Sequence, residues 1–422
     1  MNILLIGSGG REHAIAWKLA QSPLLKNLYC APSSAAINEL AEPAQINISD
    51  FDSVAKFCEE KSIDLVFVGP EAPLAAGISD ALRTKKISVF GPSKAGAMLE
   101  ASKSRAKEFM LRHGIPTAAC EIFDDAKAAE AAVMKSPLPI VIKADGLAAG
   151  KGVRVCFKRE DAIRAVEDFM EKRIFGAAGA RVAVEEFMTG PEASAMAFCD
   201  GKTCKTLPIA RDHKRLLDKD LGPNTGGMGA YCPVTDIDAK AAAVIEDIFN
   251  KFMRGITEED IDYRGVIYIG LMLTPQGPKV VEFNCRLGDP ETQVLLPIID
   301  CDLAETAAAC AEGKLSEGDL PVKKGSCACV VLAARGYPDT PEKGKKISGL
   351  EKLGDNSDVA VFHAGTNKTA DGWVTAGGRV LAVSALGTDL ESAAAAAYKA
   401  ADGISFDGMQ YRKDIASREK IS

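Results

Sequence analysis

The sequence predicts an α/β protein with a parallel N-terminal sheet, a middle α/β region and a β-rich C-terminal unit. Short apolar strands in residues 1–95 each end in a glycine or proline turn before a helical segment, as in parallel sheets with crossover helices. Residues 120–190 alternate helical and strand patterns in one compact unit, and apolar strands dominate again from about residue 326. We therefore expect domains at 1–101, 102–325 and 326–422, with a subdomain at about 120–190.

The composition predicts a water-soluble globular protein. The chain has 422 residues, 47% of them hydrophobic and 26% charged, which is typical of a protein with several buried cores. Its net charge of −7 disfavours nucleic acid or an anionic membrane as the main partner. No run reaches the roughly 18 apolar residues of a membrane helix, and the N-terminus lacks signal-peptide features. The 12 cysteines lack metal-site spacing, so we expect reduced thiols in the cytoplasm.

Three loops of the N-terminal sheet are predicted to form one ligand-binding edge. The strands NILLI, LVFV and ISVF run into the loops 7–11, 69–71 and 91–93, and ligands bind at the carboxyl ends of parallel strands. The first loop lacks the dinucleotide pattern G-x-G-x-x-G, because Glu12 stands where the third glycine belongs. A tight glycine turn before Arg11 suits one anionic group, such as a sugar phosphate. A helix-opening turn with an exposed arginine fits the pattern equally well.

The stretch 141–152, VIKADGLAAGKG, is close to a phosphate-binding P-loop but does not match it. Counted from Gly146, the second glycine, Gly150, comes one residue early. Gly152 follows Lys151 where a hydroxyl residue would hold magnesium. Backbone N–H groups and lysine charge can still bind phosphate. A glycine-rich hairpin turn with solvated lysines fits the stretch equally well.

The segment 280–286, VVEFNCR, is predicted to be a metal-binding strand. Alternation along a strand places Glu282, Asn284 and Arg286 on one face, with apolar side chains opposite. Magnesium favours a carboxylate and a neutral oxygen, with water and nucleotide phosphate as further ligands. The arginine suits a carboxylate or a phosphate in transfer. An exposed sheet face with mixed charge is the weaker alternative.

The order of these motifs resembles that of the ATP-grasp ligases. Lys103 opens a helix and Lys143 ends a strand; the glycine loop, VEEF (184–187), Glu192 and the metal strand follow. In that fold two α+β lobes close on ATP, two lysines and a flexible glycine lid hold the phosphates, and a strand with a carboxylate and an amide binds magnesium. The resemblance therefore implies an ATP-grasp fold at 102–325, with the subdomain at 120–190 as a lid and the C-terminal unit as a cap.

Longer strings resemble the glycinamide ribonucleotide synthetase family. They span nearly the whole chain in family order: GGREHAIAW (9–17), VGPEAPL (68–74), IKADGLAAGKGV (142–153), GPNTGGMGAY (222–231), EFNCRLGDPETQ (282–293) and RKDI (412–415). The chain departs from the family pattern at APSSAA (31–36), LEASK (99–103), Arg211 and the ASRE that follows RKDI. The first departure leaves the phosphate contacts of that loop open. None of them touches the metal strand or the lysines.

The resemblance implies a specific reaction in de novo purine biosynthesis. ATP, glycine and 5-phosphoribosylamine would give glycinamide ribonucleotide, ADP and phosphate through glycyl phosphate, with Mg²⁺ as the cofactor and Mn²⁺ as its substitute. We expect a cytoplasmic monomer with small-molecule substrates and no nucleic-acid or membrane partner. Two other hypotheses are a carboxylating relative that uses another carboxylate and amine, and a non-catalytic nucleotide-binding module.

The resemblance also implies roles for individual residues. The ATP site is expected at Lys103, Lys143, Gly146, Gly150, Lys151, Gly152, Glu185, Glu186, Phe187, Met188, Glu192, Arg215 and Asn224, with adenine at the 185–188 hinge and the ribose at Glu192. Phosphoribosylamine is expected among Gly10, Arg11, Glu12, Glu71, Asp212, Lys214, Arg286, Gly288 and Asp289. The metal ligands are Glu282 and Asn284, and the catalytic residues are Lys103, Lys143 and Arg286. Without the family, Asp212 and Lys214 would suit a surface ion pair.

Overall fold

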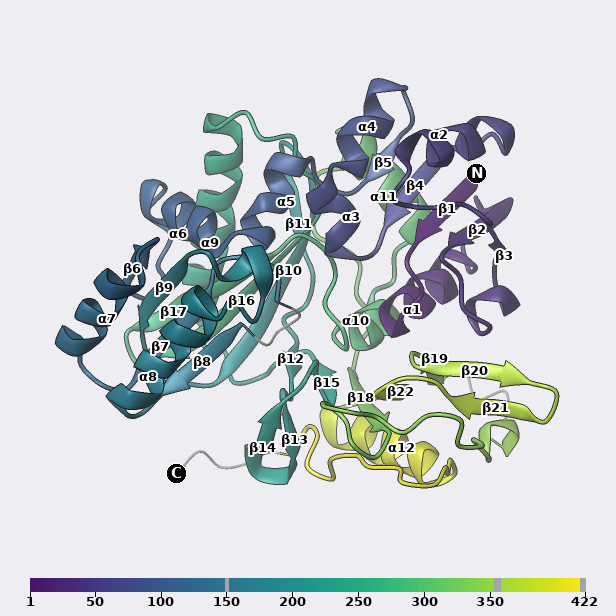
Figure 1. Cartoon of the computed structure of the whole chain (residues 1–422). Helices are drawn as coiled ribbons and strands as arrows, with labels where there is room; N and C mark the ends of the chain where they lie inside the picture. Colours follow the sequence, from purple (N-terminus) through teal and green to yellow (C-terminus); the bar gives the residue numbers. More distant parts are fainter. Residues whose placement is uncertain (149–151, 353–357, 418–422) are drawn as a thin grey trace.

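The computed structural model describes residues 1–148, 152–352 and 358–417 (Figure 1). Its N-terminal part is a five-stranded sheet of order β3-β2-β1-β4-β5 in which every pair is parallel, which confirms the prediction. The elements of this part are β1 (Asn2–Ile6), α1 (Gly10–Leu19), β2 (Asn27–Ala31), β3 (Glu42–Pro43), α2 (Phe51–Glu60), β4 (Leu65–Val68), α3 (Glu71–Ala76), α4 (Ile78–Thr84), β5 (Val89–Phe90) and α5 (Lys94–Ala101). The loops after β1 and β4 leave neighbouring central strands, so they lie side by side.

The middle region contains two antiparallel sheets of four strands each. The sheet with the longer strands, called the larger sheet, has the order β11-β10-β16-β17. The sheet with the shorter strands, called the smaller sheet, has the order β6-β9-β7-β8. The larger sheet consists of β10 (Glu192–Asp200), β11 (Cys204–Thr206), β16 (Arg264–Thr274) and β17 (Gly277–Asn284). The helices of this region outside the smaller sheet are α6 (Lys103–Arg112), α9 (Ala239–Glu258), α10 (Thr292–Ile298) and α11 (Leu303–Glu312).

The smaller sheet lies within residues 120–190, the region predicted to be the lid, and we refer to it as the lid. Its elements are β6 (Cys120–Phe123), α7 (Ala126–Lys135), β7 (Ile140–Ala144), β8 (Val153–Cys156), α8 (Arg159–Val166) and β9 (Val182–Glu186). α8 ends at Val166, and a π-helical turn, Glu167–Glu171, continues the helix. Figure 1 shows this subdomain in front of the larger sheet.

The hydrophobic cores show which parts are packed into one body. Phe67 of the N-terminal sheet belongs to the same core as Phe198 and Val266 of the larger middle sheet. Ile142 and Val184 belong to a core made of lid residues alone. The N-terminal sheet and the larger sheet are therefore packed together, whereas the lid has its own apolar centre.

The C-terminal sheet includes strands from two distant segments. Its order is β12-β15-β18-β22-β19, and β12 (Arg211–Asp212) and β15 (Gly229–Cys232) come from the middle of the chain. Between these two strands lies the hairpin of β13 (Arg215–Leu217) and β14 (Leu221–Asn224). The remaining elements are β18 (Ser326–Ala333), β19 (Val359–His363), β20 (Thr366–Thr369), β21 (Gly372–Thr375), β22 (Arg379–Gly387) and α12 (Leu390–Asp402). This pairing brings the segment 211–232 against the C-terminal unit. Within the described residues, no helix has the length and apolar character needed to cross a membrane.

Candidate active site

A cavity of about 490 Å³ lies where the three parts of the chain meet. It brings together ten of the residues predicted from the sequence: Arg11, Glu71, Lys103, Gly146, Gly152, Asn224, Glu282, Asn284, Arg286 and Asp289. Phe187 and Arg215 line an adjoining cavity of about 670 Å³, which shares Val153 and Asn224 with the first. Gly150 and Lys151 lie outside the described residues. Some of the predicted ATP residues therefore line these two cavities, whereas Lys143, Glu185, Glu186, Met188 and Glu192 line neither of them.

The lid supplies a buried lysine–carboxylate cluster to this region. Lys143 on β7 is 5% exposed, and its Nζ lies 2.8 Å from the Glu185 carboxylate of β9 and donates to the Val281 carbonyl at 3.2 Å. Lys107 of α6 approaches the same carboxylate at 3.4 Å. The side chain of Glu185 thus points to the two lysines. Its second oxygen, Oε1, is buried and has no hydrogen-bond partner in the described part of the chain.

The two predicted metal ligands lie at the end of β17. Glu282 is 3.4 Å from Lys103 Nζ. Burial would raise the pKa of Glu282, but the charges of Lys103, Lys143, Lys214 and Arg286 lower it to about 2. Glu282 is therefore ionised at neutral pH, and a carboxylate beside an amide oxygen fits a hard divalent cation. No group of three or more His, Cys, Asp or Glu able to hold a metal occurs in the described chain, so further ligands would have to come from phosphate or water.

Arg286 lies beyond the strand on which it was predicted. β17 ends at Asn284, yet the Arg286 guanidinium turns back to donate to Asn284 Oδ1 at 3.2 Å. It also pairs with Glu100 at 2.8 Å and with Glu71 at 3.3 Å. Burial would lower the pKa of Arg286, but these carboxylates raise it. The strand alternation is therefore wrong at its last position, whereas the side chain still reaches the predicted site.

A second, partly exposed network surrounds Lys214. Its Nζ lies 2.5 Å from Glu192 and 3.0 Å from Asp212. The Asp212 side chain is 6% exposed and the Lys214 side chain 40% exposed, so the pair lies partly at the surface and the surface ion pair remains an alternative. Beside it, buried Glu291 accepts hydrogen bonds from Tyr268 at 2.6 Å and Ser194 at 3.0 Å. The ammonium group of Lys214 thus contacts the carboxylate of Glu192, the first residue of β10 in the larger sheet.

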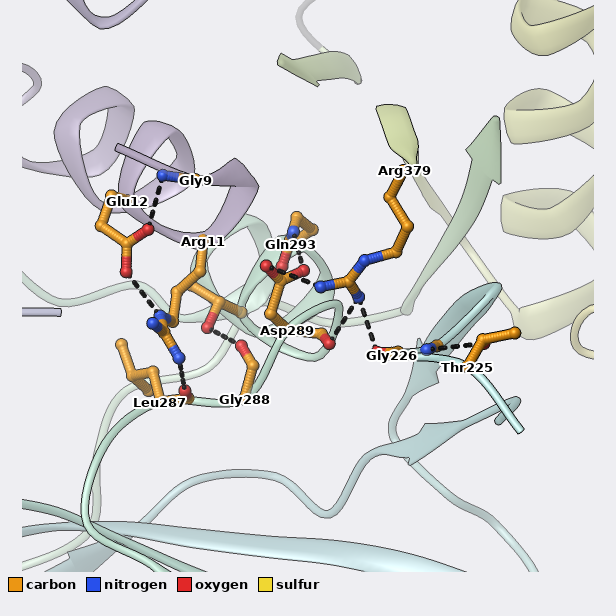
Figure 2. Close-up of polar contacts among 12 residues, drawn as sticks. Gly9, Arg11, Glu12, Thr225, Gly226, Leu287, Gly288, Asp289, Gln293 and Arg379 are labelled. Carbon is orange, nitrogen blue, oxygen red and sulfur yellow. Dashed lines mark hydrogen bonds and ion pairs between the residues drawn. The ribbon is translucent and has the colours of Figure 1, made fainter. Parts of the chain in front are cut away.

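The glycine turn before α1 is filled by a carboxylate of the chain itself (Figure 2). Glu12 accepts from Gly9 N–H at 2.7 Å and from Arg11 Nε at 2.7 Å. Gly7 and Gly69 leave room for it, since a Cβ on Gly69 would lie 2.5 Å from Glu12 Oε1. Arg11 is 8% exposed and donates to the Leu287 carbonyl at 3.0 Å, so the alternative of an exposed arginine is wrong. Gly10 begins α1 beside this turn.

Sequence reasoning missed the C-terminal contribution to the cavity. Tyr337, Pro338 and Arg379 line it, although the motifs assigned no role to their segments. Figure 2 shows Arg379 between Asp289 and Gly226, and the Asp289–Arg379 ion pair measures 3.1 Å. Burial would raise the pKa of Asp289, but Arg379 and Arg11 lower it. The only sequence signal was an arginine opening an apolar strand after two glycines, GGRVLAV.

Comparison with protein families matches almost the whole chain to phosphoribosylglycinamide synthetase. The N domain of that family matches residues 1–100, its ATP-grasp (A) domain residues 101–292 and its C domain residues 327–418. The phosphoribosylamine–glycine ligase of Mesorhizobium japonicum is 48% identical, over 100% of both chains. The trifunctional purine biosynthetic protein adenosine-3 of Homo sapiens is 47% identical, over 99% of this chain and 42% of that protein.

Solved structures agree with this match. The crystal structure of phosphoribosylamine–glycine ligase from Thermotoga maritima has a TM-score of 0.86 at 35% identity and covers 98% of this chain and 100% of that one. The biotin carboxylase domain of Hydrogenobacter thermophilus 2-oxoglutarate carboxylase has a TM-score of 0.77 at 15% identity, over 97% of this chain and 91% of that one, which shows a shared fold alone. The chain therefore belongs to the phosphoribosylglycinamide synthetase family, the ATP-grasp carbon–nitrogen ligases that act as phosphoribosylamine–glycine ligases in purine biosynthesis.

Proposed function

We propose that the cavity joins glycine to 5-phosphoribosylamine through glycyl phosphate, in a reaction driven by ATP. One observation carries this proposal: the cavity places Lys103, Glu282 and Arg286 of the middle region beside Arg11 and Glu71 of the N-terminal sheet edge. A nucleotide phosphate and a phosphorylated sugar could thus meet in one space. The family match supports the same reaction.

ATP would lie between the lid and the larger sheet. Lys103, which lines the cavity, and Lys143 would contact its phosphates, and Gly146 and Gly152 are the described ends of the glycine loop beside them. The unpaired Oε1 of Glu185 would accept a hydrogen bond from the exocyclic amine of adenine. Glu282 and Asn284 would hold Mg²⁺, or Mn²⁺ in its place, which offsets the negative charge of the phosphates.

The chemistry has two transfer steps. A carboxylate oxygen of glycine attacks the γ-phosphorus, and the bond to the β–γ bridging oxygen breaks to release ADP. The amine of phosphoribosylamine then attacks the carbonyl carbon of glycyl phosphate, loses a proton and expels phosphate. Lys103, Lys143 and Arg286 would stabilise the charge that develops on the transferred phosphoryl group.

Phosphoribosylamine would lie on the side of the N-terminal sheet. Arg286 and Arg11 provide guanidinium groups there, and Asp212 and Lys214 approach from the segment that pairs with the C-terminal sheet. The Arg11 and Glu12 side chains are paired. A substrate at the N-terminus of α1 would therefore meet the Arg11 guanidinium with the Glu12 carboxylate beside it. Gly288 and Asp289 follow Arg286 along the same loop.

A co-substrate dependence assay tests this function. Purified protein with ATP and magnesium should release ADP rapidly only when both glycine and freshly made phosphoribosylamine are present. ADP release that ignores either co-substrate would contradict the proposal. Stimulation by bicarbonate in place of glycine would favour the carboxylating alternative.

A further inference from the structure

We propose that Arg379, together with Tyr337, is a positioning residue that aligns the two substrate-binding loops for attack by the amine. The inference rests on the proposed function and deepens it. Both side chains come from the C-terminal unit, and both line the cavity. The loops in question are the GPNTGGMG loop, whose central part is 225–228, and the loop 287–290 after β17.

The guanidinium of Arg379 is engaged on both loops at once. Its Nη1 donates to the Gly226 carbonyl at 2.6 Å and to the Asp289 carbonyl at 2.8 Å. Its Nη2 lies 3.1 Å from the Asp289 carboxylate. Figure 2 shows the planar group between the two loops. An arginine held by three such contacts acts on the protein's own backbone, which favours a role in alignment.

Tyr337 holds the same glycine through its N–H group. Its hydroxyl accepts a hydrogen bond from Gly226 N–H at 2.9 Å. The packing is close, because a Cβ on Gly226 would lie 3.1 Å from Arg379 Cζ and 3.3 Å from the Tyr337 hydroxyl. Gly227 has a φ of +112°, and a Cβ there would lie 2.4 Å from Pro290. The GPNTGGMG loop is thus fixed at both its N–H and its carbonyl, against the loop that carries Asp289.

This clamp extends to the substrate residues by backbone hydrogen bonds. Thr225 N–H and its hydroxyl both donate to the Lys214 carbonyl at 2.8 Å. Met228 N–H donates to the His213 carbonyl at 2.8 Å. Fixing Gly226 therefore fixes the backbone that carries Lys214. Arg379 sets the position of Lys214 relative to Asp289, across the space assigned to phosphoribosylamine.

The expected defect is a loss of alignment after ATP has reacted. Without the clamp, glycyl phosphate still forms, but the amine no longer meets it in the reactive geometry. Water then attacks glycyl phosphate, which gives glycine and phosphate and consumes ATP without product. A misplacement of about 1 Å can cost about 100-fold in rate, whereas the ATP contacts on the lid stay intact.

Kinetics of Arg379→Ala, Arg379→Lys and Tyr337→Phe test the proposal. For Arg379→Ala we expect the half-saturating phosphoribosylamine concentration to rise at least about tenfold and the ratio of product to ADP to fall well below one. The half-saturating ATP concentration should change by less than about threefold. Arg379→Lys should be intermediate, because a lysine lacks the planar fork. Tyr337→Phe should show the same defect on a smaller scale.

Arg335→Ala is the matched control in the same unit. The Arg335 side chain is 58% exposed and pairs with Glu342 and Asp407 at the surface, so its loss should leave the kinetics unchanged. A wild-type ratio of product to ADP in both Arg379→Lys and Tyr337→Phe would overturn the inference. Equal increases in the half-saturating concentrations of ATP and phosphoribosylamine would overturn it as well, since that result indicates a general structural role.

Hydrogen exchange separates this inference from the ligase function. In the ligand-free protein, the amides of 225–228 should exchange faster in Arg379→Lys and Tyr337→Phe than in the wild type or Arg335→Ala. This measurement needs no turnover. Unchanged exchange in both variants would overturn the clamp even if ligation is confirmed, and failure of wild-type ligation would overturn only the proposed reaction.

Discussion

The two walls of the cavity are held in different ways. The lid wall has a hydrophobic core made of its own residues, and it meets the rest of the protein through polar contacts such as Lys143 to the Val281 carbonyl and Asp145 to Ser104. The opposite wall joins α1, the loop after β17 and β22 through the guanidinium groups of Arg11 and Arg379. The lid wall has its own core, and the opposite wall is made where three segments of the chain meet.

This difference matches the two demands of the proposed reaction. ATP must enter and ADP must leave, which a wall with its own core can allow by moving as a unit. The amine must attack in a fixed geometry, which a wall tied by charge-assisted hydrogen bonds maintains. The comparison therefore assigns motion to the nucleotide side and rigidity to the substrate side. Substitutions on each side should affect different kinetic constants.

The largest effect is expected where the walls meet, at Glu282. Glu282→Gln removes the negative charge that would hold the metal, so ADP formation should fall by about 100- to 1000-fold. The check is steady-state ADP release with both co-substrates present. Glu312→Gln serves as the control, because Glu312 pairs with Lys314 at the surface. Unchanged turnover would show that the catalytic site is misassigned.

On the rigid wall, Lys214→Ala should act on the substrate. The change leaves the Asp212 carboxylate without its cation, and because the Lys214 side chain is 40% exposed, the lower end of the roughly 2–5 kcal/mol cost for a buried pair applies. The half-saturating concentration of phosphoribosylamine should therefore rise by about 30-fold or more. Titrations of phosphoribosylamine and of ATP measure this difference. An equal rise for both would remove Lys214 from the substrate pocket.

On the lid wall, Asp145→Ala should act on ATP. The Asp145 carboxylate accepts from Ser104 N–H at 2.7 Å and from the Ser102 hydroxyl at 3.1 Å, at the start of α6, where Lys103 also lies. Its loss frees the helix start from the lid and should raise the half-saturating ATP concentration by about tenfold, as for a lost helix cap. Asp124→Ala, an exposed lid residue, is the control. If the half-saturating phosphoribosylamine concentration rose more than that of ATP, the assignment of the lid wall to ATP would be wrong.

Local sequence patterns predicted the candidate metal ligands, whereas the contacts of Arg379 depend on pairing between distant strands. Glu282 and Asn284 could be predicted to share one face because alternation along one strand needs no tertiary information. Arg379 was missed because it lies 153 residues from Gly226 and reaches it only after β15 pairs with β18 and β18 with β22. The glycine turn before α1 shows the same limit, since its pattern suits an external anion or the carboxylate of Glu12 alike. Geometry alone shows that Glu12 fills it.

The smallest predicted effect compares the motion of the two walls directly. Some amides exchange with solvent only when the lid is open, and the open form does not bind ATP. Their exchange rate should therefore fall by a factor of one plus the ligand concentration divided by Kd. At about three times Kd of ATP with magnesium, amides at 146–148 and 152 should slow by about fourfold. Amides at 225–228 and 287–289 should change less, because Arg379 and Arg11 already hold those loops. Hydrogen exchange with mass spectrometry measures both sets in one sample. If the lid amides gain no protection, or if the clamped loops gain more, the division into a moving wall and a rigid wall is wrong.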